Sequence, residues 1–302
     1  MRLDRSNCFK HLIILEVFNL NPDYKKIIKA LDIGANFILK NYIDENGCFT
    51  IPEGVERIGR ESFADLKELK SIIIPNTVKY IGDNAFYGCE NLRRITIPDS
   101  VYSIGESAFM DCCDLEEVKL SENMCCISGA LFMNCLSLKT ITIPKKVFRI
   151  NSCAFCGCEN LERIEIPGNV EEIYECAFSF CINLKDIIIN NGVRIIRWGA
   201  FSDCRSLEEI FIPATVRFID DDVFGDCKKL RKMEVDSNNK YYDSRNDCNG
   251  IIDSAIDEMV ATCSDSILPD GVSLSQRKIE NKKKVYESKD ETFWNIVHNV
   301  VY

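Results

Sequence analysis

A leucine recurs every 23 residues over most of this chain, and this period constrains the fold more than any other feature of the sequence. It occupies eight positions: Leu69, Leu92, Leu115, Leu138, Leu161, Leu184, Leu207 and Leu230. A cysteine stands at the twenty-first position of seven of these units: Cys89, Cys112, Cys135, Cys158, Cys181, Cys204 and Cys227. A fixed period of about 20–50 residues is typical of repeat architectures whose units stack on one another. We therefore expect a solenoid.

The unit at residues 69–91, LKSIIIPNTVKYIGDNAFYGCEN, contains one clear strand signal. Ile72 and Ile74 alternate with the intervening Ile73, which indicates a short strand with one buried face. Pro75 ends the strand because proline has no amide hydrogen to donate to a sheet ladder. The unit therefore begins with a strand that buries its fourth and sixth positions and exposes its fifth.

The rest of the unit contributes further apolar residues to the same interior. Residues 78–81 predict a second short extended piece, and residues 84–89 predict either one helical turn or a compact loop. One unit of this size cannot bury enough apolar surface to stand alone, so neighbouring units have to pair their strands and close the core above and below. We expect parallel strands stacked as one sheet.

The repeated pattern LxxIxIPxxVxxIGxxAFxxC is similar to the BspA-like, or Treponema-type, leucine-rich repeat. The resemblance runs from about residue 49 to residue 272, and residues 235–269 resemble the irregular insertion that such proteins carry between repeats. It implies an α/β solenoid, a right-handed coil of short parallel strands with short helical turns. It also implies a surface-exposed or secreted binding protein, often an adhesin of host-associated bacteria, rather than an enzyme.

The register of the repeat divides the chain into three parts. Residues 1–45 lie outside it and predict an N-terminal cap, with a helix after Asn21 and either helix or strand at residues 37–43. Residues 46–272 form the solenoid, with irregular last repeats from residue 236. Residues 273–302 form a polar C-terminal tail, in which Asp290 predicts the start of a short helix.

Composition limits the class of partner. The net charge of −10 argues against a nucleic-acid partner, because binding phosphates needs concentrated lysine and arginine. No run of 18 or more apolar residues occurs, so we expect no membrane span. The apolar stretch at residues 11–18 is short and contains Glu16, so it does not predict a signal peptide.

Cysteine is the outlier of the composition, with 17 in the chain. For the seven at the twenty-first position we expect a structural role, in which a small, weakly polar side chain packs beside the backbone of the next coil. The odd total and the missing signal favour a reducing, cytoplasmic location, whereas the family resemblance implies the cell surface or secretion. Outside the ladder, Cys8 and Cys248 are expected to be the more reactive thiols.

The stretch Cys153-Ala-Phe-Cys156-Gly-Cys158 raises the question of a metal or redox site. A zinc site needs a second ligand pair or histidines at matching spacing, and both histidines lie outside the repeats. Cys153 and Cys176 fall on adjacent coils, where a disulfide is sterically allowed but disfavoured by parallel side chains. Because no catalytic triad or phosphate-binding loop is visible either, we expect no enzyme, no metal and no cofactor.

The exposed columns of the solenoid are the candidate binding surface. The fifth position carries Ile73, Thr96, Lys119, Thr142, Glu165, Ile188 and Phe211. Ile188 and Phe211 are large apolar residues on adjacent coils where solvent is expected, so they predict an apolar patch. A second set, for which partial burial is the simpler interpretation, comprises Tyr80, Tyr102, Phe148 and Phe218.

Three functional hypotheses follow. The first is a non-enzymatic protein–protein interaction or adhesion module whose partner is a host or cell-surface protein. The second is a cytoplasmic scaffold protein, favoured by the free thiols and the missing signal. The third, a thiol or metal-binding protein, rests on the stretch around Cys156 alone.

Overall fold

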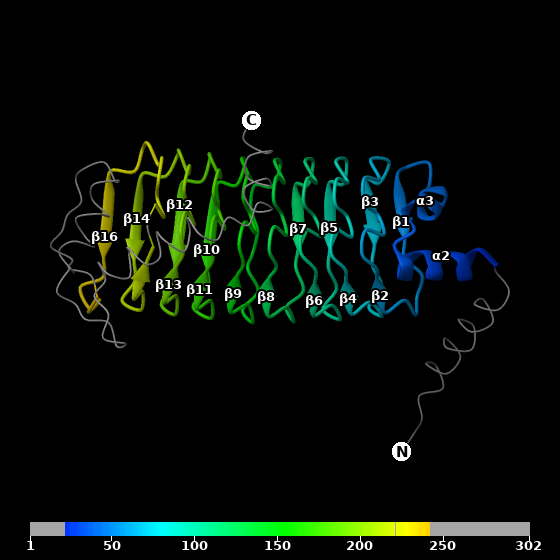
Figure 1. The fold of residues 1–302 in the computed structure, drawn as a ribbon, viewed down its shortest axis with the longest axis horizontal. Coiled ribbons are helices and arrows are strands. Elements are labelled where there is room, and N and C mark those ends of the chain that lie inside the picture. Colours follow the sequence, from blue (N-terminus) through cyan, green and yellow to red (C-terminus); the bar gives the residue numbers. More distant parts are fainter. Residues whose placement is uncertain (1–21, 221, 242–302) are drawn as a thin grey trace, which may run out of the picture.

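The computed structural model describes residues 22–220 and 222–241, which form a straight solenoid of stacked coils (Figure 1). Short helices lie at one end and the last strand lies at the other. The strand pairs among these residues are all parallel, and the two partners of each pair are offset by 23 residues, as Phe49 is against Ile72. The stacked, 23-residue leucine-rich coil that the sequence predicts is confirmed.

In all coils except the one that begins at Leu138, a first strand lies within the third to sixth positions of the repeat. These strands are β1 (Cys48–Thr50), β3 (Ser71–Ile73), β5 (Arg94–Thr96), β7 (Glu117–Lys119), β10 (Arg163–Ile166), β12 (Asp186–Ile189), β14 (Glu209–Ile212) and β16 (Lys232–Val235). Burial alternates along each of them, so that Ile187 and Ile189 are buried on either side of exposed Ile188 in β12. The inward column that includes Ile72, Ile95 and Ile141 is buried throughout.

These strands do not form one continuous sheet, which corrects the expectation drawn from the sequence. The hydrogen-bonded groups are β1-β3-β5-β7, β10-β12 and β14-β16. The coil that begins at Leu138 has no strand here and keeps a single bridge, between Thr140 and Arg163. Its Thr-Ile-Thr-Ile sequence alternates like the others, and nothing in the structure explains the interruption.

A second strand of two residues follows in each coil. These strands are β2 (Arg57–Ile58), β4 (Tyr80–Ile81), β6 (Ser103–Ile104), β8 (Cys126–Ile127), β9 (Arg149–Ile150), β11 (Glu172–Ile173), β13 (Ile195–Ile196) and β15 (Phe218–Ile219). They pair in two further parallel sheets, β2-β4-β6 and β15-β13-β11-β9-β8. The second extended piece that the sequence predicts is therefore present, and it builds its own side of the solenoid.

The third side of each coil is a run of turns rather than a helix. In the coil of Phe86, the amides of Asn84, Phe86 and Gly88 donate to carbonyls of the next coil at 2.8–2.9 Å. The amides between them close tight turns within the coil, as Tyr87 does onto Asn84. Of the two alternatives left open by the sequence, the compact loop is correct, because every second amide is used to bond the neighbouring coil.

This turn geometry requires two left-handed residues per coil, at positions 16 and 20, a requirement that sequence reasoning missed. The non-glycine members with positive φ are Glu61, Asp65, Asn84, Ser107, Asp111, Ala130, Asn134, Cys153, Cys176, Phe180, Asp203, Asp222 and Asp226. Aspartate, asparagine and glycine dominate position 20, and these are the residues that adopt this conformation most readily. The enrichment of these residues at position 20 could therefore have predicted the left-handed turns from the sequence alone.

A column of phenylalanines runs through the core at position 18. Its members are Phe63, Phe86, Phe109, Phe132, Phe155, Phe178, Phe201 and Phe224, all fully buried. Neighbouring rings stack with centroids 5.1–5.8 Å apart and planes within 3–16° of parallel. Each ring thus packs against the coil on either side, which couples the coils to one another.

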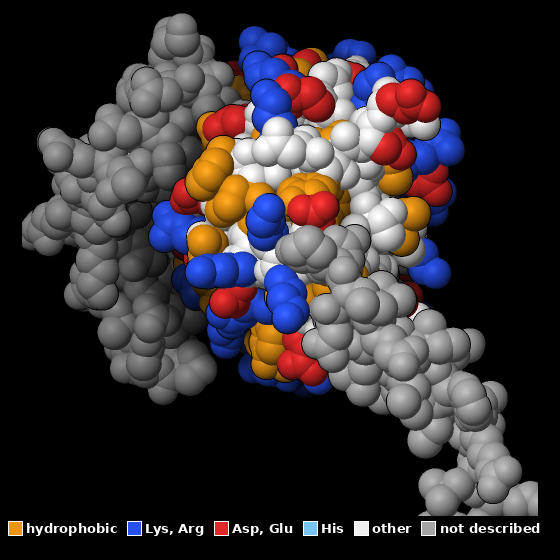
Figure 2. Space-filling model, turned by 90° about the vertical axis from the view of Figure 1, so that its right-hand side faces the viewer, with side chains coloured by type: hydrophobic (Ala, Val, Ile, Leu, Met, Phe, Trp, Pro, Cys, Tyr) orange, Lys and Arg blue, Asp and Glu red, His pale blue; other side chains and the backbone are white. Residues whose placement is uncertain are grey.

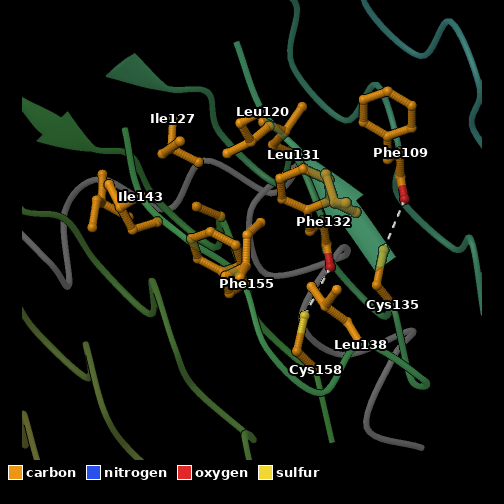
Figure 3. Packing of buried hydrophobic residues seen from close by; sticks show 14 of the residues in the cluster. Phe109, Leu120, Ile127, Leu131, Phe132, Cys135, Leu138, Ile143, Phe155 and Cys158 are labelled. Carbon is orange, nitrogen blue, oxygen red and sulfur yellow. Dashed lines mark hydrogen bonds between the residues drawn. The ribbon is translucent and has the colours of Figure 1, made fainter. Parts of the chain in front are cut away.

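The cysteine column lies beside the phenylalanines and is buried, as the sequence predicts. Each thiol donates a hydrogen bond to the carbonyl oxygen of a phenylalanine 26 residues earlier, as Cys135 does to Phe109 and Cys158 to Phe132 (Figure 3). The sulfur–oxygen distances along the column are 3.0–3.4 Å. The acceptor of this hydrogen bond therefore belongs to the preceding coil. We refer to these seven residues as the cysteine ladder.

Helices cover the open side of the first coil. They are α2 (Pro22–Ile33), α3 (Asn36–Leu39) and the 3-10 turn η1 (Lys40–Tyr42), so the segment after Gly34 is helical rather than extended. Leu31 and Leu39 are buried in the same core as Phe49 and Ile58. The Leu31 carbonyl accepts hydrogen bonds from the Gly59 amide at 2.7 Å and the Ser62 hydroxyl at 2.9 Å. Seen from this end, hydrophobic and uncharged surface is interspersed with charged side chains of both signs (Figure 2).

Several sequence-based expectations lie outside the described residues. They concern the irregular repeats after residue 241, the helix at Asp290, the apolar stretch at residues 11–18, and Cys8 and Cys248. Among residues 22–220 and 222–241, no helix has the length and apolar character needed to cross a membrane.

Candidate protein-binding face

The seven residues singled out at position 5 are all exposed, and they follow one another along the first-strand side of the solenoid. Strand alternation places them there, because the fourth and sixth positions point into the core. Ile73, Ile188 and Phe211 keep 56%, 37% and 46% of their surface exposed. We call this set, together with Thr50 and Glu234 at the same position of the outer coils, the position-5 column.

Ile188 and Phe211 lie side by side on β12 and β14, whose residues are in contact. An open hollow of about 450 Å³ lies over them. Its lining residues are Arg163, Lys185, Asp186, Ile187, Ile188, Glu209, Ile210, Phe211, Lys232 and Glu234. An apolar centre bordered by charges of both signs is the usual composition of a protein-binding surface.

Two further open hollows lie over the same side of the solenoid. One, of about 580 Å³, is lined by Ile73, Thr96 and Lys119 among others. The other, of about 350 Å³, is lined by Thr142 and Glu165 among others. The position-5 column is thus one extended, hollowed surface, and its C-terminal part carries the two adjacent large apolar side chains.

Charged residues at position 3 border the column, and sequence reasoning did not include them. Arg94 on β5 pairs with Glu117 on β7 at 3.6 Å, and Lys232 pairs with Glu234 within β16. At position 5 itself, the Glu165 carboxylate accepts a hydrogen bond from the side-chain amide of Asn190 at 3.0 Å. The same 23-residue spacing that revealed position 5 would have found position 3, because both face solvent from one strand.

The second aromatic set lies on the side formed by the two-residue strands. Tyr80 and Tyr102 pack edge to face with ring centroids 4.6 Å apart, and the Arg57 guanidinium lies 5.4 Å above the Tyr80 ring. The Arg149 guanidinium lies 5.2 Å from the Phe148 ring. Tyr80 and Phe218 are partly buried, whereas Tyr102 and Phe148 are exposed. Partial burial therefore accounts for half of the set.

All cysteines within residues 22–220 and 222–241 are free thiols. Burial raises the pKa of Cys89 and Cys158 to about 12. Burial likewise raises the pKa of Cys112, Cys135, Cys181 and Cys204 well above the ordinary value. In this part of the chain no group of three or more His, Cys, Asp or Glu side chains is arranged to hold a metal ion. The ladder thiols are therefore suited to packing rather than to chemistry.

We expect maleimide to label Cys125 first among the described cysteines, and the ladder only on unfolding. Cys125 is exposed, whereas Cys158 is buried and its raised pKa makes its thiolate about 10³-fold scarcer than that of an ordinary thiol. Timed labelling of the native protein near neutral pH, followed by peptide mass mapping, measures the order. Equal rates at Cys125 and Cys158 in folded protein would show that the ladder is open to solvent.

The comparisons with known proteins match this architecture. The BspA type leucine rich repeat region, in six copies, matches residues 42–162 and 126–252, which is more than half of the 302-residue chain. The chain belongs to the BspA-type leucine-rich repeat family. Leucine-rich repeat proteins of this kind usually mediate protein interaction, and the fold is typically non-enzymatic.

Solved structures of bacterial leucine-rich repeat proteins are similar to this chain. A leucine-rich repeat protein from Bacteroides ovatus is 29% identical with a TM-score of 0.53, over 64% of this chain and 57% of that one. The T. pallidum leucine rich repeat protein is 26% identical with a TM-score of 0.52, over 59% of this chain and 85% of that one. A leucine rich cell surface protein from Faecalibacterium prausnitzii is 30% identical with a TM-score of 0.47, over 66% of this chain and 50% of that one.

The chain thus spans little more than half the length of the Bacteroides ovatus protein and half that of the Faecalibacterium protein. Among curated proteins there is no match.

Proposed function

We propose that this BspA-type repeat is a binding module that engages a partner protein through the position-5 column, with Ile188 and Phe211 at the centre of the contact. The observation that carries the proposal is the pair of large apolar side chains exposed side by side on β12 and β14. The fold does not need them there, because Thr96 and Thr142 occupy the same position in other coils. The partner we envisage is a host or cell-surface protein, as for an adhesin.

The surroundings of this pair fit a protein partner. Large apolar residues near the centre of an interface commonly carry most of its binding energy, about 2 kcal/mol or more each when truncated. The bordering Arg163, Lys185, Glu209 and Lys232 supply charges that select among partners without being buried. The hollow over them is open rather than enclosed, which suits a protein surface better than a small molecule.

The test is the double variant Ile188→Ala, Phe211→Ala. We expect each substitution to change the free energy of unfolding by about 0.5 kcal/mol or less, because both side chains are exposed. We expect capture of partner proteins from cell or host extracts to fall by about tenfold or more, from the loss of two central apolar contacts. Thermal melting and quantitative mass spectrometry of captured proteins measure the two effects.

Phe148→Ala is the matched control. Phe148 is 40% exposed, close to the 46% of Phe211, but it lies on the other side of the solenoid. This control should leave capture unchanged. A double variant that melts normally and captures the same proteins as wild type would place the binding site elsewhere.

A cytoplasmic scaffold is the second candidate, and the free state of the cysteines in residues 22–220 and 222–241 favours it. Both candidates use the same face, so the capture experiment does not separate them. The two candidates are separated by fractionating the native cell and identifying the mature N-terminus by mass spectrometry. Protein recovered only inside the cell would exclude adhesion.

A further inference from the structure

Three cysteines outside the ladder lie together on the turn side of two neighbouring coils. Cys153, Cys156 and Cys176 form an apolar cluster with Met133 that is separate from the solenoid core. The side chains packed against this cluster are Met110, Ala130, Phe180 and Trp198. Three thiols from two coils thus share one small apolar site.

Their backbone geometry holds them close. Cys153 and Cys156 belong to one tight turn, closed by a hydrogen bond from the Cys156 amide to the Cys153 carbonyl at 3.0 Å. Cys176 stands one repeat further on, and the Cys153 amide donates to the adjacent Glu175 carbonyl at 2.9 Å. The side chains of all three cysteines pack in this one cluster. Cys153 is therefore the residue that backbone hydrogen bonds tie both to the turn of Cys156 and to the coil of Cys176.

This site differs from the cysteine ladder in two respects. A ladder thiol such as Cys158 donates to a backbone carbonyl and is fully buried, whereas the three cluster thiols pack against one another and keep 5–6% of their surface exposed. Cys153 and Cys176 also adopt left-handed backbone, with φ of +56° and +52°. Cysteine is not a residue that favours this conformation, so the demands of the turn do not explain its presence in two successive coils.

We propose that Cys153 and Cys156 are a redox-active dithiol that a hydroperoxide oxidises to a disulfide within the turn. The Cys153 sulfur attacks the peroxide O–O bond, which yields a sulfenic acid and one water from hydrogen peroxide. The Cys156 sulfur then attacks the sulfenic sulfur, forms the S–S bond and releases a second water. Two electrons and two protons leave the thiols, and the peroxide is reduced.

The mutual influence of the packed thiols supports Cys153 as the attacking sulfur. The neighbouring Cys156 thiol, and after it the Cys176 thiol, lower the pKa of Cys153 against the opposing effect of burial. The bond to Cys153, and then burial, raise the pKa of Cys156 and of Cys176. Cys153 is thus the thiol that reaches the reactive thiolate form first, and Cys156 resolves the sulfenic acid.

Geometry favours Cys156 over Cys176 as the partner. Cys153 and Cys176 stand on successive coils, which the hydrogen bond from the Cys153 amide to the Glu175 carbonyl joins. A disulfide has a narrow geometry, so joining Cys153 to Cys176 would constrain the spacing of two separate coils. Cys153 and Cys156 already belong to one turn, closed by the hydrogen bond from the Cys156 amide to the Cys153 carbonyl, so a disulfide between them links no separate coils.

The experiment treats the full chain with hydrogen peroxide, blocks the remaining thiols, and maps disulfides in the digest by mass spectrometry. We expect a Cys153–Cys156 bond, loss of two free thiols, and reversal by dithiothreitol. Cys153→Ser and Cys156→Ser should each abolish this bond, and Cys176→Ser should retain it. Cys113→Ser is the control, because it removes a partly buried thiol outside the cluster.

Three results would overturn the proposal: a Cys153–Cys176 bond in place of the expected one, no intramolecular disulfide at Cys153, or oxidation confined to the exposed Cys125 and its neighbour Cys126. The mapping of wild-type protein decides the matter by itself, so a variant that fails to fold does not obscure it.

Discussion

Replacing Phe155 with alanine is expected to lower the free energy of unfolding by about 3–5 kcal/mol, the range found for buried phenylalanines. Phe155 is fully buried, and its ring stacks between those of Phe132 and Phe178 at centroid distances of 5.5 and 5.1 Å. Truncation leaves a cavity in the middle of the column and removes the ring contacts to both neighbouring coils. Chemical denaturation followed by circular dichroism measures the loss.

The control for this prediction is Phe148→Ala, which removes the same side chain from an exposed site. Phe148→Ala should lower the free energy of unfolding by about 0.5 kcal/mol or less, because the ring and its contact with Arg149 are exposed to solvent. If the two variants unfold at similar denaturant concentrations, the phenylalanine column does not carry the coupling between coils that we assign to it.

Gly192→Ala is expected to lower the free energy of unfolding by about 2–4 kcal/mol, because it combines left-handed backbone strain with overpacking. Gly192 has φ of +138°, a conformation that side-chain-bearing residues rarely adopt. A β-carbon at this position would lie 1.8 Å from the carbonyl oxygen of Gly168 in the preceding coil, and that backbone atom cannot rotate away. The two coils would have to separate locally, which a lowered melting temperature detects.

Gly129→Ala is the matched substitution without these constraints. No left-handed φ occurs at Gly129, and the nearest atom to an added β-carbon is the Ser152 carbonyl oxygen at 3.6 Å. This change should stabilise the protein by about 0.4–1 kcal/mol, because alanine restricts the unfolded chain. A Gly192→Ala variant as stable as Gly129→Ala would mean that the close approach to Gly168 is readily relieved.

Much of the binding face could be predicted because it depends on a local rule. Strand alternation around Ile72 and Ile74 sets Ile73 outward, and the 23-residue period carries this assignment to Ile188 and Phe211 without knowledge of the contacts. The hollow over Ile188 and Phe211, and the charges of Lys185 and Glu209 beside it, depend on how neighbouring side chains pack. That packing is not encoded in a period.

The cysteine ladder likewise follows from the repeat period, whereas the cluster of Cys153, Cys156 and Cys176 depends on tertiary packing. The 23-residue interval by itself determined the stacking register, the buried phenylalanine and cysteine columns and the outward face, since residues one period apart must lie on neighbouring coils. Only the tertiary structure decided that the third side is a ladder of turns with left-handed residues such as Cys153, and that this backbone turns Cys153, Cys156 and Cys176 onto one another. The direction of a side chain in a turn depends on φ and ψ values that bonds to the next coil impose, whereas the direction in a strand follows from alternation alone.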